Sequence, residues 1–245
     1  MTIPPLDRAR DQMLLPGFGA EGQARLAASS VLCARIGGLG GPAALELAVA
    51  GIGRLRVAHG EPIKPAHMHR MIAMADTALG DPGIDSGIEA LRRVNGDIVY
   101  EAIGSDTCSR EHAKELVAGM DAVLSAPPSM EQRLWLNEAA VCARIPFIDA
   151  AMHGWLGQVL VVLPGESACL ACLCESPPPL EKPFPVLGAT SAVAGCIGAA
   201  EVVKILAGLP GGPGGRLLRF DLARWSFQRL DAPRRPDCPV CSGAS

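Results

Sequence analysis

The chain has 245 residues, of which 49% are hydrophobic, enough to fill the core of one large domain. Charged residues make up 19%, with 22 basic and 25 acidic side chains, so no strong field attracts the phosphates of nucleic acid. We expect no apolar run of the roughly 20 residues that cross a bilayer. The start, MTIPPLDRARDQM, also lacks a signal-peptide pattern. These features exclude a nucleic-acid or membrane partner and predict a cytoplasmic protein.

Short apolar runs alternate with helix-period segments over the first part of the chain. The runs SSVLCARI, RLRVAH, DIVYEAI, DAVLSA and PFIDA favour strands. Helices are expected from Pro42 to about Gly51, from Ile84 to Val94 and from Glu131 to Ala143. This alternation is typical of βαβ units. It predicts an α/β fold with a Rossmann-like, mostly parallel sheet flanked by helices.

The later part of the chain has a different pattern. GQVLVVL and RLLRFDL favour strands of an antiparallel C-terminal extension, and a small-residue helix is expected from Thr190 to Ala207. Prolines exclude a helix or a central strand from the segment SPPPLEKPFP, so residues 175–189 are predicted to form a crossing loop. We expect one domain, residues 1–245, in which residues 1–28 form an N-terminal helical arm.

Two Cys-x-x-Cys pairs predict a metal site. Cys169, Cys172, Cys238 and Cys241 offer four thiolates, the set that closes a tetrahedral zinc site. Because sulfur fills all four positions, the zinc is expected to be structural and to fasten the C-terminal tail. The alternative is four separate buried thiols, since cysteine also serves as a small hydrophobic residue.

Several motifs together resemble the ThiF/MoeB/HesA family of E1-like activating enzymes. They are LLPGFGAEGQARL, GGLGGPAALELAVAGIGRL, the strand-leading GQV, the cysteine pairs and the close RLLRFD…CPVC, and the resemblance runs from about Leu14 to Gly243. Members bind Mg-ATP at the first βαβ unit, adenylate the C-terminal glycine of a small ubiquitin-like or sulfur-carrier protein, and usually form homodimers. The resemblance implies the same activity here only where the site residues match.

The resemblance places a nucleotide or anion site on six positions. They are Arg35, Gly38, Gly40, His59, Glu61 and Arg70. Arg35 replaces the first glycine of the turn, where a backbone must approach phosphate closely, so its side chain is expected either to fill the pocket or to meet an anion. His59 replaces the acidic residue that holds the ribose, and a histidine is a poor substitute for a carboxylate. Glu61 and Arg70 are retained.

Other family positions have lost their chemistry. Gly83 replaces the lysine that steadies the phosphates, and the stretch Ser125 to Pro128 lacks the magnesium-binding aspartate. Asp11 replaces the arginine that reaches across the dimer, although the adjacent Arg10 is an alternative. Adenylyl transfer depends on such cations and on metal, so use of ATP and Mg is not expected to survive these replacements.

Three functions remain open. The leading prediction is a non-adenylating E1-like binding or scaffold protein in a modification or cofactor-assembly pathway. It would hold the peptide tail of a small carrier protein near Trp155 and residues 177–185, as a homodimer or as a heterodimer with an active relative. The first alternative is an active adenylyltransferase with a rebuilt site. The second is an enzyme of another class that binds a different anion in this basic crevice.

Overall fold

The computed structural model describes residues 5–174, 176, 179, 183–209 and 214–243. Its strands are β1 (Ser30–Ala34), β2 (Arg54–Ala58), β3 (Val99–Ile103), β4 (Ala122–Ser125), β5 (Phe147–His153), β6 (Leu156–Val162), β7 (Arg216–Asp221) and β8 (Ser226–Asp231). They form one sheet in the order β3-β2-β1-β4-β5-β6-β7-β8. Neighbours from β3 to β5 are parallel and those from β5 to β8 are antiparallel. The predicted mostly parallel sheet with an antiparallel extension is confirmed.

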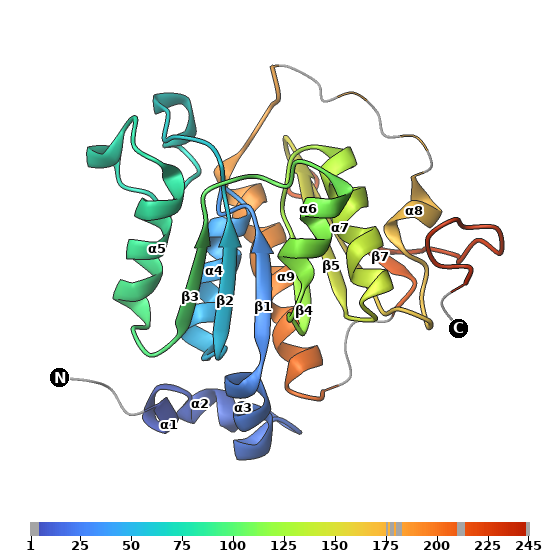
Figure 1. Ribbon diagram of the computed structural model, residues 1–245, viewed down its shortest axis with the longest axis horizontal. Helices are drawn as coiled ribbons and strands as arrows, with labels where there is room; N and C mark the ends of the chain where they lie inside the picture. The colour runs from blue at the N-terminus through green and yellow to red at the C-terminus, as the bar shows by residue number, and fades with distance from the viewer. Residues whose placement is uncertain (1–4, 175, 177–178, 180–182, 210–213, 244–245) are drawn as a thin grey trace.

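Helices cover both faces of this sheet (Figure 1). One face packs on α4 (Gly40–Ala50), α5 (Gly83–Val94) and α9 (Gly188–Leu206). The other packs on α6 (Arg110–Val117), α7 (Met130–Cys142) and the short α8 (Leu170–Leu173). The N-terminal arm contains α1 (Pro5–Arg8), α2 (Arg10–Met13) and α3 (Gly19–Ala28), and two 3-10 turns span Pro65–His67 and Asp76–Ala78.

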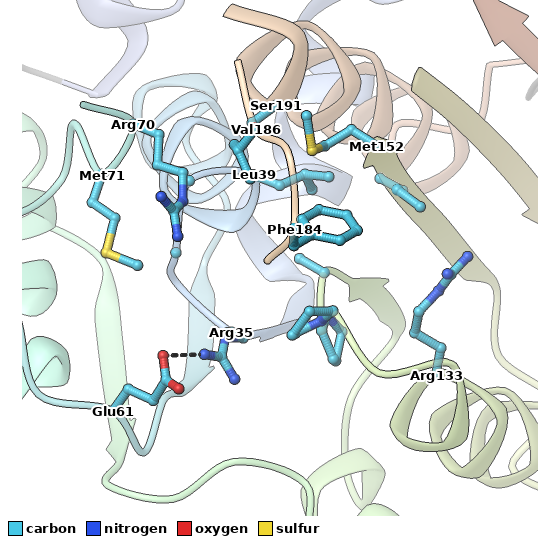
Figure 2. A pocket seen from close by; sticks show the side chains of 17 residues that line it. Arg35, Leu39, Glu61, Arg70, Met71, Arg133, Met152, Phe184, Val186 and Ser191 are labelled. Carbon is cyan, nitrogen blue, oxygen red and sulfur yellow. Dashed lines mark hydrogen bonds and ion pairs between the residues drawn. The ribbon is translucent and has the colours of Figure 1, made fainter. Parts of the chain in front are cut away.

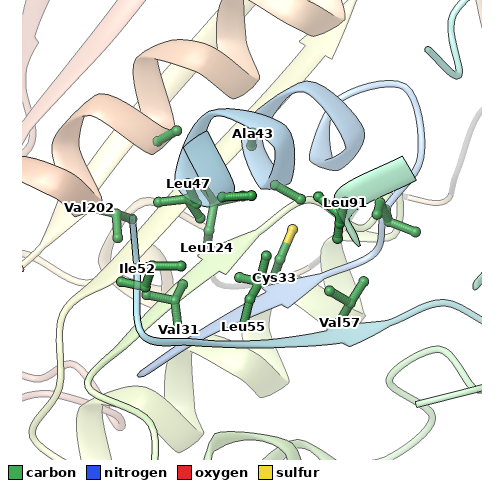
Figure 3. Packing of buried hydrophobic residues seen from close by; sticks show 14 of the residues in the cluster. Val31, Cys33, Ala43, Leu47, Ile52, Leu55, Val57, Leu91, Leu124 and Val202 are labelled. Carbon is green, nitrogen blue, oxygen red and sulfur yellow. The ribbon is translucent and has the colours of Figure 1, made fainter. Parts of the chain in front are cut away.

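The first βαβ unit explains how the sequence positions the site. Leu47 of α4 packs among Val31, Leu55 and Leu124 from three neighbouring strands, and all four are fully buried (Figure 3). Burial of each such side chain contributes on the order of 2 kcal/mol. The helix ends where predicted, at Gly51, whose φ of 88° is the left-handed conformation that glycine adopts without strain. The turn between β1 and α4 is thereby held on a rigid core.

The prediction that no apolar segment is long enough to cross a bilayer was wrong for α9. Among the described residues, α9 is the one helix that is long and apolar enough to cross a membrane, with 19 residues. It packs on α4 and on β4, β5 and β6. A β-carbon on Gly195 would lie 2.3 Å from the Leu39 carbonyl oxygen, so α9 and the start of α4 touch through their backbones. This packing explains the small, apolar composition of the helix.

Candidate ligand pocket and cysteine cluster

A cavity of about 220 Å³ lies where the carboxyl ends of β1, β4 and β5 meet the amino ends of α4 and α9. The chain leaves β1 toward β2 on one side, and β4 lies on the other side of β1. Ligands of open α/β sheets bind at such a switch point, because the connections diverge there. The polar lining comes from Arg35, Glu61, Arg70, Arg133 and Ser191 (Figure 2). The apolar lining includes Leu39, Met71, Pro127, Pro128, Met152 and Phe184.

Arg35 lines the cavity but its charge is directed at protein carboxylates. Its guanidinium donates to Asp106 at 2.8 Å and forms a second ion pair with Glu61, and its side chain is 13% exposed. The residue has a φ of 85°, the left-handed region that favours glycine. Arg35 therefore does not fill the cavity, and the anions that it meets are Glu61 and Asp106. Sequence patterns gave no indication of Asp106.

Arg70 enters the cavity from the opposite wall (Figure 2). A β-carbon on Gly38 would lie 2.9 Å from the Arg70 side chain, and one on Gly188 would lie 3.3 Å from the Arg70 α-carbon. Arg70 is thus packed between the turn before α4 and the first residue of α9. Its guanidinium donates to the Ala66 carbonyl at 2.9 Å. Burial lowers the pKa of Arg70, because a charged guanidinium is less well solvated there.

A buried ion pair between Arg133, which lines the cavity, and Asp149 lies on the far side from Arg70. Arg133 of α7 donates to both carboxylate oxygens of Asp149 on β5, with an Nε–Oδ1 distance of 2.8 Å. Asp149 is 0% exposed and Arg133 6%. Burial opposes the charge on Arg133, but the Asp149 carboxylate outweighs this and raises its pKa. An aspartate in the apolar run PFIDA was a signal for this pair, because a buried carboxylate needs a partner.

The four cysteines of the two pairs come together beside α7, whose Asn137 accepts a hydrogen bond from the Leu170 N–H. Their sulfur atoms all lie within 4.8 Å of one another, and all four residues are buried. Zinc–sulfur bonds of about 2.3 Å imply sulfur–sulfur distances of about 3.8 Å around a tetrahedral ion. The distances are 3.7 Å between Cys169 and Cys238 and 3.4 Å between Cys172 and Cys241. The cluster can therefore hold a metal ion with little rearrangement.

Neighbouring groups favour a thiolate at Cys238, whereas burial raises the pKa of Cys169 and Cys172. Burial opposes ionisation of Cys238, but the backbone N–H groups of Cys241 and Val240 outweigh it and lower the pKa of Cys238 to about 7. The backbone N–H of Arg235 donates to the Cys172 sulfur at 3.5 Å. Because a bound metal needs deprotonated sulfur, these donors fit the group that the cysteine spacing predicts.

The model of the ThiF family matches residues 9–240. The chain belongs to the ThiF family. It is 36% identical over 242 residues to protein HesA of Leptolyngbya boryana, across 98% of this chain and 87% of that protein. It is 35% identical to a sulfur carrier protein adenylyltransferase of Thermus thermophilus, across 98% and 92%. The crystal structure of E. coli MccB with MccA-N7isoASN has a TM-score of 0.87 at 19% identity, over 99% of this chain and 76% of that one, and shows a common fold.

Two departures from the ThiF-family pattern are sterically linked. A β-carbon on Gly83 would lie 2.8 Å from the His59 ring, so this ring occupies the space beside the position at which the resemblance implies a lysine. His59 is 1% exposed and lies beneath the cavity instead of lining it. Burial and the nearby Arg35 lower its pKa to about 4, so the imidazole is neutral near pH 7. The position that the resemblance assigns to ribose binding thus lies in the core.

The remaining candidate positions divide between cavity and scaffold. Gly38 lines the cavity, whereas Gly40 does not, because it packs where a β-carbon would lie 1.8 Å from the Arg35 carbonyl oxygen. Pro127 and Pro128 line the cavity where the resemblance implies a carboxylate for magnesium. The exposed Arg10 lies on α2 at the amino ends of the strands, opposite the cavity (Figure 1). It does not reach the cavity of its own chain.

The later part of the predicted crossing loop, residues 175–189, forms part of the cavity wall, where Phe184 and Val186 line it. Residues 175, 177, 178 and 180–182 of that loop lie outside the described residues, and residues 188 and 189 belong to α9. The Gly154 N–H donates to the Pro185 carbonyl at 3.0 Å, which fastens this segment to the end of β5. Phe184 packs edge-on to His153 with ring centroids 5.2 Å apart. Trp155, at the same turn, is 54% exposed.

Proposed function

We propose that this ThiF-family protein does not adenylate a substrate and that it binds the peptide tail of a small carrier protein in a modification or cofactor-assembly pathway. The observation that carries this proposal is the pairing of Arg35 with Glu61 and Asp106. Glu61 is the retained acidic residue of the ribose-binding segment, and its carboxylate is engaged by a side chain of the same chain. The ribose of a nucleotide would have to compete with Arg35 for this carboxylate.

The rest of the cavity supports the same proposal. The lysine and the magnesium carboxylate that the resemblance implies are replaced by Gly83 and by Pro127 and Pro128. Removing one group that stabilises charge in a transition state costs about 10² to 10³ in rate. Loss of both, together with the internally paired Glu61, is incompatible with efficient adenylyl transfer.

The relatives supply the class of partner. One is named a sulfur carrier protein adenylyltransferase, and the MccB structure contains MccA-N7isoASN. A second cavity of about 230 Å³ shares Arg133, Ala151 and Met152 with the first. Together the two cavities give an elongated crevice beside Trp155. Such a crevice suits an extended tail, which can be held without ATP.

We further propose that zinc occupies the cysteine cluster and is structural. Cys169 precedes α8 after β6 and Cys172 lies within α8, whereas Cys238 and Cys241 lie in the C-terminal segment. An ion there joins two segments that are far apart in the chain and leaves no coordination position for a substrate. The predicted homodimer, or heterodimer with an active relative, is part of the same proposal, and light scattering of the purified protein tests it.

An active adenylyltransferase is the second candidate, favoured by one observation. Arg70, the retained phosphate-contacting position of the family, points into the cavity. The two candidates are separated by incubating the zinc-loaded protein with Mg-ATP and a small sulfur-carrier protein that has an intact C-terminus. We expect complex formation without nucleotide and no AMP or pyrophosphate. Release of AMP that depends on the carrier would overturn the proposal in favour of the active enzyme.

A further inference from the structure

Asn137 is a fully buried amide on α7, beside the cysteine cluster. Helix α7 packs against the short α8 (Figure 1). The backbone N–H of Leu170, the first residue of α8, donates to Asn137 Oδ1 at 2.9 Å. Because a backbone N–H can only donate, this contact fixes which end of the amide is the oxygen. The Nδ2 group is therefore directed away from that N–H, next to Cys169, which immediately precedes Leu170.

The Nδ2 group of Asn137 is a buried donor that needs an acceptor. It has no hydrogen-bond partner among the described residues. A buried donor left without a partner costs about 1–3 kcal/mol, so such a group calls for an explanation. Burial raises the pKa of Cys169, and the Asn137 side chain is the strongest of the groups that oppose this. A neutral thiol accepts hydrogen bonds weakly, whereas a negatively charged sulfur accepts them well.

The cysteine cluster needs donors of this kind once a metal is bound. Four thiolates outweigh the charge of one divalent ion, and all four residues are buried. Backbone N–H groups offset this excess at two of the sulfurs. The Arg235 N–H donates to the Cys172 sulfur at 3.5 Å, and other backbone donors favour the thiolate of Cys238. At Cys169 the strongest donor is instead a side chain, that of Asn137.

We infer that Asn137 is a positioning residue of the metal site, whose Nδ2–H group donates to the metal-bound sulfur of Cys169 while its Oδ1 holds the start of α8. This inference rests on the proposed zinc site and adds a residue outside the four ligands that aligns one of them. The same helix carries Arg133 one turn earlier, and Arg133 lines both cavities. Helix α7 thus joins the metal site to the wall of the crevice.

Two variants separate the donor of the amide from its acceptor. Asn137→Asp keeps the shape and the acceptor for the Leu170 N–H but removes the donor, whereas Asn137→Leu removes both. The full chain is loaded with Co²⁺ and titrated with a chelator, and zinc affinity is measured by competition. Both variants should bind metal about 10- to 100-fold more weakly. Their thiolate-to-cobalt charge-transfer band should move to longer wavelength, because a sulfur without the hydrogen bond gives up an electron more easily.

Asn95→Asp is the matched control. Asn95 is also a buried amide, and its Nδ2 donates to the Ala48 carbonyl at 2.8 Å. It lies at the end of α5, which packs on the opposite face of the sheet from α7. The control makes the same chemical change and disturbs a buried hydrogen bond, but far from the cysteines. It should leave both the metal affinity and the cobalt band unchanged.

Each outcome decides the inference. Wild-type affinity and spectrum in both Asn137 variants overturn it and leave the zinc site intact. An equal loss of affinity in Asn95→Asp also overturns it, since general destabilisation then explains the effect. A wild-type protein that binds neither zinc nor cobalt overturns the zinc site and this inference together. If neither Asn137 variant folds, NMR of the wild-type protein loaded with an NMR-active cadmium isotope decides. Coupling of the Asn137 amide protons to cadmium supports the inference, and coupling confined to backbone N–H groups overturns it.

Discussion

Replacing Arg35 by glycine and by alanine separates backbone strain from ion pairing. Both changes remove the pairs with Glu61 and Asp106, but alanine keeps a β-carbon at the φ of 85° and glycine does not. The left-handed conformation costs a residue with a β-carbon about 1–2 kcal/mol. Glycine avoids this cost, but it also makes the unfolded chain more flexible, which lowers the free energy of unfolding by about 0.4–1 kcal/mol. Arg35→Gly should therefore be more stable than Arg35→Ala by about 1 kcal/mol.

Urea unfolding of the two zinc-loaded variants, followed by circular dichroism, measures this difference. For a chain of 245 residues it corresponds to about 2–4 °C in melting temperature. The wild-type protein should be at least as stable as Arg35→Gly at low salt, since it retains both ion pairs, and the gap should narrow at high salt. If Arg35→Gly is no more stable than Arg35→Ala, the backbone at this position is not strained and the account of the turn is wrong.

Three further predictions concern the scaffold of the site. Asp149→Asn leaves the buried Arg133 without its charged partner and should lower the free energy of unfolding in urea by about 3–5 kcal/mol. The control Glu138→Gln, in the more exposed pair with Arg110, should lower it by less than about 1 kcal/mol. Similar losses for the two variants would contradict the argument from burial. The pKa of His59 is about 4 in the folded protein and 6.5 ordinarily. The unfolded chain therefore takes up a proton at His59 before the folded protein does, and the free energy of unfolding falls by about 3 kcal/mol as the pH is lowered from 6.5 to 4. His59→Gln should flatten that part of the stability–pH curve, and parallel curves would refute it. Chelation of the metal should expose four reactive thiols and lower the melting temperature. A purified protein that contains no metal, and whose melting temperature is the same with and without the chelator, would exclude the zinc site.

The sequence predicted those parts of the fold that depend on local patterns. Residue type and spacing predict that α4 ends at Gly51 and that the two cysteine pairs meet, and both are seen in the structure. Helix α6 was missed because it is short and rich in charge, although Ser109 accepts a hydrogen bond from the His112 N–H as an N-cap should. Strand β8 was missed because its residues are mostly exposed and give no alternation of buried positions.

The candidate site was predictable in its location but not in its ion pairs. Arg35, Glu61 and Arg70 were recognised because they follow strands in a known pattern. Asp106 is 71 residues from Arg35, and Asp149 is 16 residues from Arg133 on a different element. Residue type alone does not specify these partners, because the pairing depends on which loops and helices the sheet brings together at one edge. The resemblance implied a role for His59 in the pocket, and the tight packing against Gly83 instead placed it in the core.

We propose that this member of the ThiF family has kept the fold and lost the nucleotide site. The most direct test is calorimetric titration of the purified, zinc-loaded protein with ATP, with and without magnesium. We predict no heat of binding at millimolar nucleotide under either condition. Micromolar binding that requires magnesium would show that the Arg35 ion pairs open for the nucleotide, and would contradict the account.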